Sequence, residues 1–204
     1  IDDQSNVYVV NTVDSNVTKI EPNGTSSTFA STGIYPVRIT QDSFGNMYTA
    51  NSDQTVTKIE PNGTSTTYGT TSPQPNAIVV DDAGNVYTAN AGTSSNVTKI
   101  EPDGTSTTYG TTGYQPNDMK FDADGNLYTT NWDNNVSKIE PDGTSSILGT
   151  TGLSPSGIVI DADGNLYTAN SGSNSISKIT PGGTTTTIGS TGRSPRGLVV
   201  DAVG

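Results

Sequence analysis

One short phrase built around a tyrosine recurs five times along this chain of 204 residues. The copy at residues 154–192 reads SPSGIVIDADGNLYTANSGSNSISKITPGGTTTTIGSTG. Because each unit of such a repeat must bury its faces against its neighbours, this regularity constrains the fold more than any other feature. The function must then lie in how the copies differ. The tyrosines follow one another at steps of 40, 39, 41 and 39 residues: Tyr8, Tyr48, Tyr87, Tyr128 and Tyr167.

The copy at residues 154–192 predicts four short strands, which we label A to D. An apolar run bounded by turn residues indicates strand A, and the pair Asp163 and Gly164 favours a tight type I′ hairpin turn into strand B. A threonine-rich segment suits an outer strand D. Units of about forty residues with four antiparallel strands and no helical pattern are typical of propeller blades. The four strands are expected at residues 157–161, 166–170, 176–180 and 184–188.

The first and last residues of the chain match different parts of one predicted blade. Residues 1–3 match only the tail of a strand A, whereas residues 195–201 read PRGLVVD, a strand A with no blade after it. We therefore predict an all-β fold, a five-bladed β-propeller of four-stranded antiparallel blades, closed by pairing of the N- and C-terminal segments. It is expected to form a single domain over residues 1–204. The alternative is a window cut from a ring of six to eight blades, which would leave two exposed strand edges.

The composition narrows the choice of partners. Twenty acidic and nine basic residues give a net charge of -11, which repels nucleic acids and anionic membranes and favours cations, neutral sugars or basic proteins. We expect no membrane insertion, because no stretch approaches the roughly 20 apolar residues of a membrane helix. The abundance of threonine, serine, asparagine and glycine is typical of secreted bacterial β-proteins, and it predicts an extracellular or cell-surface location.

The two ends of each predicted blade differ in how much they vary between copies. The A–B turns read DSFGN, DDAGN, DADGN and DADGN, and four of the five C–D turns read EPNGT or EPDGT. At the opposite end, which we call the variable end, the D–A loops differ around a constant proline: TGIYPVR, TSPQPNA, TGYQPND, TGLSPSG and TGRSPRG. The B–C loops of the same end carry the single Trp132. Since loops on a rigid scaffold carry function, we expect a ligand to bind at the variable end.

The fourth copy combines a stacking surface with amide and carboxylate groups at its variable end. Such a set suits a polar ligand, a carbohydrate or a protein. One member, Asn131, belongs to a series of five asparagines that end strand B, for which capping of the strand is the alternative role. The predicted ligand-binding residues are Tyr114, Gln115, Asn117, Asp118, Asn131, Trp132 and Asp133, with Arg196 at the matching start of the last strand A.

Two patterns could supply oxygen ligands to calcium or magnesium. Asn76, Asn117 and Asp118 lie at the start of predicted strands A, with one carboxylate among them. The DADGN turns resemble the start of an EF-hand loop, but they lack its distal glutamate, and the third copy has Ala83 at the second aspartate. A hairpin turn explains DADGN better. We therefore expect no cofactor, with a calcium or magnesium ion at Asn76, Asn117 and Asp118 as the alternative.

The usual catalytic groups are missing from the sequence. It contains no histidine and no cysteine, which removes the commonest general bases and the thiol nucleophiles. The sequence therefore argues against an enzyme.

The phrases PSGIVIDADGNLYTAN and NSISKITPGGT resemble the repeats of NHL-type propellers, most closely those grouped with the streptogramin (virginiamycin B) lyases. The resemblance covers the whole chain and implies a propeller. The lyases use a catalytic histidine and a bound magnesium, and a chain without histidine cannot carry that residue over. Gluconolactonase- and regucalcin-like propellers hold a divalent metal with glutamate, asparagine and aspartate. Asn76 and Asn117 are similar to their asparagine, but no glutamate lies at the variable end.

Three functions remain open at this point. The first is a non-catalytic binding or scaffold propeller that recognises a carbohydrate or a protein through the B–C and D–A loops. The second is a metal-dependent lactonase- or lyase-like enzyme with a divalent ion at the channel mouth. The third is a structural spacer of a larger surface protein or assembly. Chelation separates the first two, because the metal-dependent enzyme should lose a metal-induced gain in thermal stability.

Overall fold

The computed structural model describes residues 2–201, which form 19 strands. Within these residues, no helix is long and apolar enough to cross a membrane. The chain divides into two compact units, Ile1–Thr88 with Thr98–Thr108, and Ala89–Val97 with Tyr109–Gly204.

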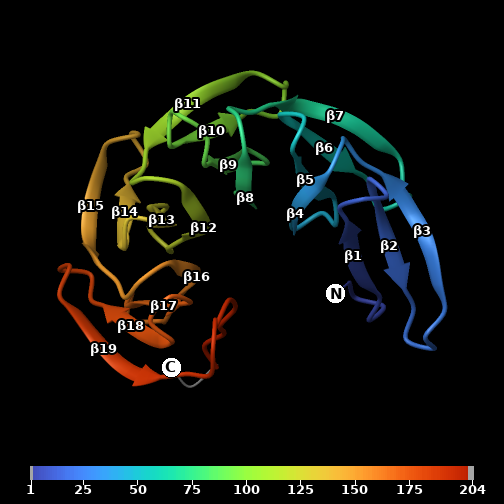
Figure 1. Ribbon diagram of the computed structural model, residues 1–204. Coiled ribbons are helices and arrows are strands. Elements are labelled where there is room, and N and C mark those ends of the chain that lie inside the picture. Colours follow the sequence, from blue (N-terminus) through green and yellow to red (C-terminus); the bar gives the residue numbers. More distant parts are fainter. Residues whose placement is uncertain (1, 202–204) are drawn as a thin grey trace. The chain divides into compact units, whose positions relative to one another are not determined.

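The strands form five sheets that follow one another along the chain (Figure 1). Within the first, second, fourth and fifth sheets, every pair of neighbouring strands is antiparallel. The sheets are β1 (Val7–Asn11), β2 (Asn16–Ile20) and β3 (Ser26–Ser31); β4 (Pro36–Gln41), β5 (Met47–Asn51), β6 (Thr55–Ile59) and β7 (Ser65–Thr70); β8 (Pro75–Val80), β9 (Val86–Asn90), β10 (Asn96–Ile100) and β11 (Ser106–Thr111); β12 (Pro116–Phe121), β13 (Leu127–Asn131), β14 (Asn135–Ile139) and β15 (Ser145–Thr150); β16 (Pro155–Ile160), β17 (Leu166–Asn170), β18 (Ser175–Ile179) and β19 (Thr185–Ser190).

The five sheets confirm the predicted blades. The four strands expected within residues 154–192 are β16 to β19, and their ends lie no more than two residues from the expected positions. Strand A begins earlier than expected because Pro155 already faces Asn170, before a bulge that brings Gly157 opposite Ala169. The constant proline of the first four D–A loops is thus the first residue of a strand.

The first sheet has three strands, and residues 195–201 do not form the predicted strand. A strand requires a ladder of backbone hydrogen bonds, which this segment lacks. It nevertheless lies where the next strand A belongs. Ser156 Oγ donates to the carbonyl oxygen of Pro195 at 2.7 Å, as Asn117 Nδ2 donates to that of Pro155 at 3.3 Å one repeat earlier. Closure by pairing of the two terminal segments, and the single domain, stay predictions.

The A–B turns differ from the predicted type I′ geometry. In the fifth sheet, Gly164 N donates to the carbonyl oxygen of Asp161 at 3.1 Å, and Asp161 N donates to that of Asn165 at 3.0 Å. Of residues 162–164, only Gly164 has a positive φ, 78°. The connection is therefore a type I turn followed by a left-handed glycine. The type I′ prediction was wrong because the aspartate side chain, described next, organises this turn.

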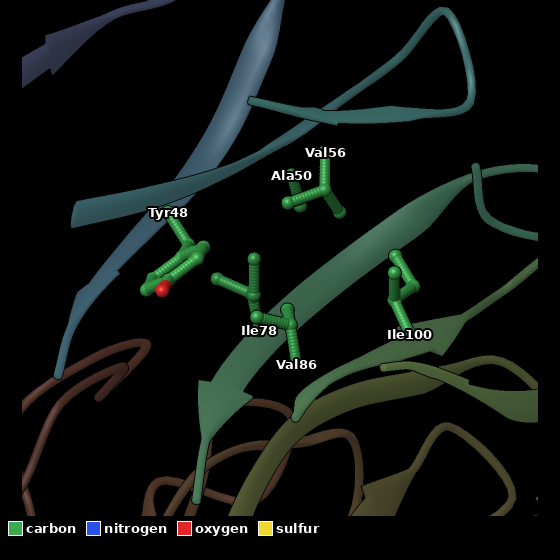
Figure 2. Packing of buried hydrophobic residues seen from close by; sticks show 6 residues of the cluster. All are labelled: Tyr48, Ala50, Val56, Ile78, Val86 and Ile100. Atoms are coloured by element: carbon green, nitrogen blue, oxygen red, sulfur yellow. The ribbon is translucent and has the colours of Figure 1, made fainter. Parts of the chain in front are cut away.

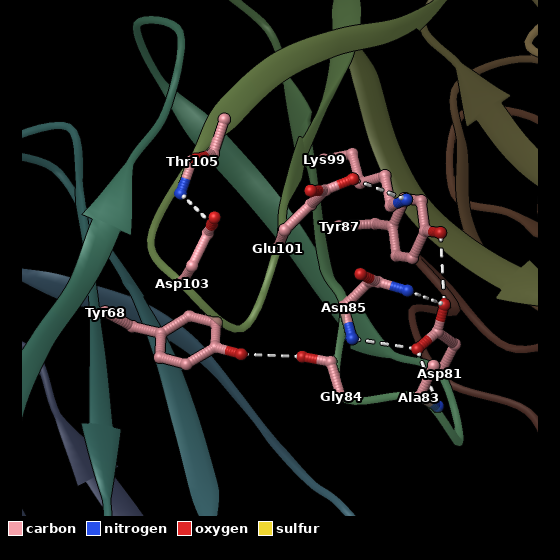
Figure 3. Close-up of polar contacts among 10 residues, drawn as sticks. All are labelled: Tyr68, Asp81, Ala83, Gly84, Asn85, Tyr87, Lys99, Glu101, Asp103 and Thr105. Atoms are coloured by element: carbon pink, nitrogen blue, oxygen red, sulfur yellow. Dashed lines mark hydrogen bonds and ion pairs between the residues drawn. The ribbon is translucent and has the colours of Figure 1, made fainter.

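One aspartate in each A–B turn ties the turn to strand B. Asp161 Oδ1 accepts the backbone N–H groups of Asp163 at 3.0 Å and Asn165 at 2.8 Å, and Oδ2 accepts Asn165 Nδ2 at 2.8 Å and the Tyr167 hydroxyl at 2.9 Å. Figure 3 shows the equivalent turn of the third sheet. Both oxygens are thus occupied by protein donors, which supports the hairpin interpretation of DADGN. The same four bonds occur at Asp2, Asp42, Asp81, Asp122 and Asp161.

These bonds favour the ionised carboxylate. Hydrogen bonding by Asn6 is the main cause that lowers the pKa of Asp2, to about 2. For Asp42 and Asp122, burial raises the pKa, but the bonds from the asparagine, the tyrosine and the backbone together outweigh it, so the pKa lies below its usual value.

Neighbouring sheets bury their apolar faces against each other. Figure 2 shows such a core in the first unit, where side chains of β5 and β6 pack against those of β8, β9 and β10. In the second unit, side chains of the fourth and fifth sheets form the corresponding core: Tyr128, Val136, Ile158, Leu166 and Ile179. Each blade is therefore stabilised by its neighbours, as the repeat requires.

Substitution Leu166→Ala is expected to reduce the free energy of unfolding by about 2–5 kcal/mol, because Leu166 is fully buried between two sheets. Ile147→Ala is the matched control, since Ile147 is 54% exposed on the outer strand β15. Urea unfolding of both variants measures the difference. Equal losses in the two variants would contradict the assigned core.

The stability of the fold is expected to fall at both extremes of pH. The pKa of Asp2 is about 2 in the folded protein and 3.8 without the fold, so its contribution is complete above about pH 4 and is lost as the pH falls toward 2. Burial, and then the bond to Asp2, raise the pKa of Tyr8 from 10.0 to about 12, so its contribution is complete below about pH 10 and is lost as the pH rises through 12. Urea midpoints measured between pH 2 and 12 test this, and midpoints unchanged at both extremes would refute it.

Candidate functional site

Two loops meet at the variable end of the fourth sheet. Residues 112–115 connect β11 to β12, and residues 132–134 connect β13 to β14. Trp132 N donates to the carbonyl oxygen of Tyr114 at 2.8 Å, and Tyr114 N donates to Asp133 Oδ2 at 3.2 Å. The predicted residues Tyr114, Trp132 and Asp133 are therefore brought together.

Each of the two loops contains a non-glycine residue in the left-handed region. Gln115 has a φ of 50° directly before Pro116, and Asn134 has a φ of 64°. Such conformations persist only when the surroundings hold them. Gln115 N donates to Ser95 Oγ at 3.2 Å, and Asn134 N donates to the carbonyl oxygen of Asn131 at 3.0 Å. The loops are thus held in one conformation before any ligand binds.

Gly113 allows the two loops to approach closely. A Cβ atom at this position would lie 2.7 Å from Asp133 Oδ1, 2.7 Å from Asn135 Oδ1 and 2.8 Å from Asn131 Nδ2. A larger residue would push the loops apart here, so Gly113 has a packing role in this D–A loop.

The site presents apolar side chains to solvent. Tyr114 is 56% exposed and Trp132 is 57% exposed. Leu153, also 57% exposed, lies on the next D–A loop, which is tied to the same B–C loop because Asn134 Oδ1 accepts Ser154 N at 2.8 Å. Leu153 is not among the ligand-binding residues predicted from the sequence. The repeat could have indicated it, because Leu153 occupies in its own copy the position that Tyr114 occupies in the fourth copy.

The second sheet has the same loop geometry with different side chains. Ser52 N donates to the carbonyl oxygen of Ile34 at 3.0 Å, and Ile34 N donates to Asp53 Oδ2 at 2.8 Å. Ile34 therefore corresponds to Tyr114, and Ser52 to Trp132. Because the backbone bonds are alike, it is the side chains that distinguish the two loop pairs.

The other predicted residues lie apart from this pair of loops or are engaged elsewhere. Asn117 Nδ2 donates to the carbonyl oxygen of Pro155, toward the fifth sheet. Arg196 is exposed on the C-terminal segment, beside Ser156 and Gly157.

Asn131 makes hydrogen bonds that favour a structural role over the predicted ligand-binding role. It is fully buried, and its Nδ2 donates to Asn135 Oδ1 at 2.7 Å and Ser137 Oγ at 2.8 Å, while its Oδ1 accepts the Thr129 hydroxyl at 3.0 Å. Asn170 makes the equivalent bonds in the fifth sheet. These asparagines tie strand B to strand C, which is closer to the capping alternative than to a ligand site.

The proposed metal ligands do not fit a divalent ion. Asp118 Oδ1 accepts Met119 N at 3.0 Å, and Oδ2 accepts Ile158 N at 3.2 Å. The amide of Asn117 already donates to a backbone carbonyl. Within residues 2–201, no group of three or more aspartate, glutamate, histidine or cysteine side chains could hold a metal. The one carboxylate of this set therefore offers a calcium or magnesium ion no oxygen atom that lacks a protein donor.

Successive antiparallel sheets packed face to face define a β-propeller, and solved structures share this fold. A catalytically inactive virginiamycin B lyase from Staphylococcus aureus, solved with quinupristin, is similar with a TM-score of 0.80 and 18% identity, covering 97% of this chain and 71% of that chain. The chain belongs to the virginiamycin B lyase family, whose model matches residues 2–200. Among curated proteins, no match to the sequence was found.

Two further structures show that the fold is shared by proteins of different kinds. A gluconolactonase from Xanthomonas campestris is similar with a TM-score of 0.73 and 14% identity, covering 98% of this chain and 77% of that chain. A chain of the nidogen/laminin complex is similar with a TM-score of 0.70 and 16% identity, covering 87% of this chain and 72% of that chain. Similarity at such low sequence identity establishes the fold only. The activity has to be inferred from the residues of the site.

Substitution Asn131→Ala is expected to lower the free energy of unfolding by about 1–3 kcal/mol, because it leaves buried partners unsatisfied. The adjacent Trp132→Ala change is the control and should alter it by less than about 0.5 kcal/mol, since Trp132 is exposed. Urea unfolding distinguishes them. An Asn131→Ala protein as stable as the parent would favour the ligand-binding role of Asn131 over the structural role.

Proposed function

We propose that this chain is a non-catalytic, extracellular or cell-surface binding propeller that recognises a carbohydrate through the variable end of its fourth sheet. The observation that carries the proposal is the pair of exposed aromatic side chains, Tyr114 and Trp132, on two hydrogen-bonded loops. The same loop positions hold Ile34 and Ser52 in the second sheet.

The chemistry of the pair suits a sugar. An aromatic ring offers an apolar face to the C–H groups of a sugar ring, and a Tyr hydroxyl or Trp N–H adds a polar edge. Gln115 follows Tyr114 in the D–A loop and adds an amide, and the carboxylate of Asp133 accepts the backbone N–H of Tyr114. Because hydrogen bonds already order both loops, binding costs less conformational entropy than it would for mobile loops.

Binding is favoured over catalysis by the residues available. The lyase relative is described as catalytically inactive in a variant that replaces a histidine with alanine, and these 204 residues contain no histidine. A lactonase-like site would need carboxylate oxygens open to a metal, whereas both oxygens of Asp118 accept backbone N–H groups.

A protein ligand is the second candidate. One of the similar structures comes from the nidogen/laminin complex, and Trp and Tyr are the side chains that most often dominate affinity at protein interfaces. A protein ligand would use the same two aromatic side chains, so it predicts the same sensitive residues but no response to free sugars.

Titration with cello-, xylo-, manno- and chito-oligosaccharides is expected to change the fluorescence of Trp132, the single tryptophan, in a saturable way for at least one series. Substitution Tyr114→Ala should weaken that response about tenfold or more, as expected when an aromatic face worth about 1.5–3 kcal/mol is lost.

The matched control is Ile147→Ala, an exposed apolar residue on the outer strand β15, which should leave the titration unchanged. Absence of a response to every series would refute the carbohydrate proposal. A response that persists in Tyr114→Ala would place the ligand elsewhere.

A further inference from the structure

A cavity of about 280 Å³ lies in the first unit, at the end of the sheets opposite the variable end. It is bounded by residues of the first and second sheets and by their A–B turns. The side chains that matter for its chemistry are Asp3, Tyr8, Lys19, Phe29, Gln41 and Phe44.

The next pair of sheets in the same unit shows how this space is otherwise filled. Tyr68 packs edge-on against Tyr48 with ring centroids 5.1 Å apart, and its hydroxyl donates to the carbonyl oxygen of Gly84 at 2.7 Å (Figure 3). The side chain of Tyr68 thus bridges from the outer strand of one blade to the A–B turn of the next.

Phe29 takes the place of Tyr68 at the cavity. It packs edge-on against Tyr8 at 5.0 Å, but it has no hydroxyl to reach the next turn. The carbonyl oxygen of Gly45, the counterpart of Gly84, instead accepts Gln41 Nε2 at 3.3 Å. A single missing oxygen atom therefore leaves this junction without its bridge.

Other departures from the repeat gather at the same cavity. Gln41 ends its strand A where the later copies have Val80, Phe121 and Ile160. Phe44 is 76% exposed in its A–B turn, where the later copies have Ala83, Asp124 and Asp163. A large apolar side chain so exposed at the mouth of a cavity is suited to covering a ligand.

The cavity is lined by one lysine, Lys19, and by two aspartates, Asp2 and Asp3. Lys19 Nζ lies 3.9 Å from Glu21, whereas the equivalent pairs in the third and fourth sheets are 3.2 and 3.1 Å apart. Among residues 2–201, Asp3 has no hydrogen bond or ion pair to its carboxylate. Asp2, beside it, already accepts four hydrogen bonds. A ligand would thus meet one ammonium group and one carboxylate.

We propose that this cavity binds a free aromatic amino acid. The carboxylate of the ligand pairs with Lys19, its ammonium group pairs with Asp3, and its ring packs against Phe29 and Phe44. The volume lies near the lower end of the roughly 300–1,000 Å³ of ligand pockets, which suits a molecule of this size. The proposal is independent of the carbohydrate site, which lies in the other unit.

Calorimetric titration with L-phenylalanine is expected to give saturable binding with one ligand per chain. Phenylacetate and phenethylamine each lack one of the two charges, and each should bind about tenfold more weakly or worse, as expected when a charge-assisted hydrogen bond is lost. Absence of L-phenylalanine binding, or equal binding of either comparison compound, would overturn the proposal.

Substitution Phe29→Tyr supplies the oxygen found at Tyr68 and should abolish binding while the thermal unfolding temperature is kept. Lys19→Gln is a second variant that leaves the cavity open, and it should weaken L-phenylalanine about tenfold but not phenethylamine. Trp132→Ala is the control for the carbohydrate site and should leave the L-phenylalanine titration unchanged. Undiminished binding in both Phe29→Tyr and Lys19→Gln would place the ligand elsewhere.

Discussion

The aspartate that accepts four hydrogen bonds in each A–B turn is the interaction on which the rest of the structure depends. In the fourth sheet, Asp122 holds the turn through Asn126 and orients Tyr128 on strand B. This sets the register of strand B, and a slip of one residue would turn every inward side chain outward. With the register set, Asn131 at the far end of β13 points inward and ties strand C in place. The loops at the variable end therefore connect strands whose register is already set.

The backbone hydrogen bonds of the loops are the same in different sheets, whereas the side chains on these loops differ. The backbone bonds of the loops are alike in the second and fourth sheets, yet Ser52 in one corresponds to Trp132 in the other. The loop backbone therefore determines where the side chain at this position lies, whichever residue type occupies it. The same separation holds at the opposite end, where Phe29 replaces a bridging tyrosine without disturbing the edge-on packing on Tyr8. Family membership is thus compatible with a site whose chemistry differs from that of a histidine-dependent lyase.

The period, the positions of the strands and the division into constant and variable ends could be predicted from the sequence, because the repeat displays each of them several times. The direction of individual side chains could not. Asn131 ends a strand at the variable end and recurs in all five copies, a pattern that fits a ligand site and a structural role alike. Its bonds to Asn135 and Ser137 favour the structural role. Trp132, which occurs once, lies in solvent. The type I′ turn was wrong because a carboxylate accepting bonds from the turn backbone cannot be read from residue types alone. The cavity beside Phe29 lies where Tyr68 and its hydroxyl bridge the next pair of sheets, and residue types alone do not show that this hydroxyl reaches the next turn.

The central claim is that the side chains at the variable end of the fourth sheet, and not the loop backbone, define the ligand site. The most direct test is calorimetric titration of a variant that gives this end the side chains of the second sheet, Tyr114→Ile with Gln115→Tyr and Trp132→Ser, using the oligosaccharide series that changes Trp132 fluorescence in the parent protein. The two loop pairs have the same length, so the account predicts an unfolding temperature close to that of the parent and no detectable binding. Binding of the oligosaccharide with unchanged affinity by the variant would contradict the account.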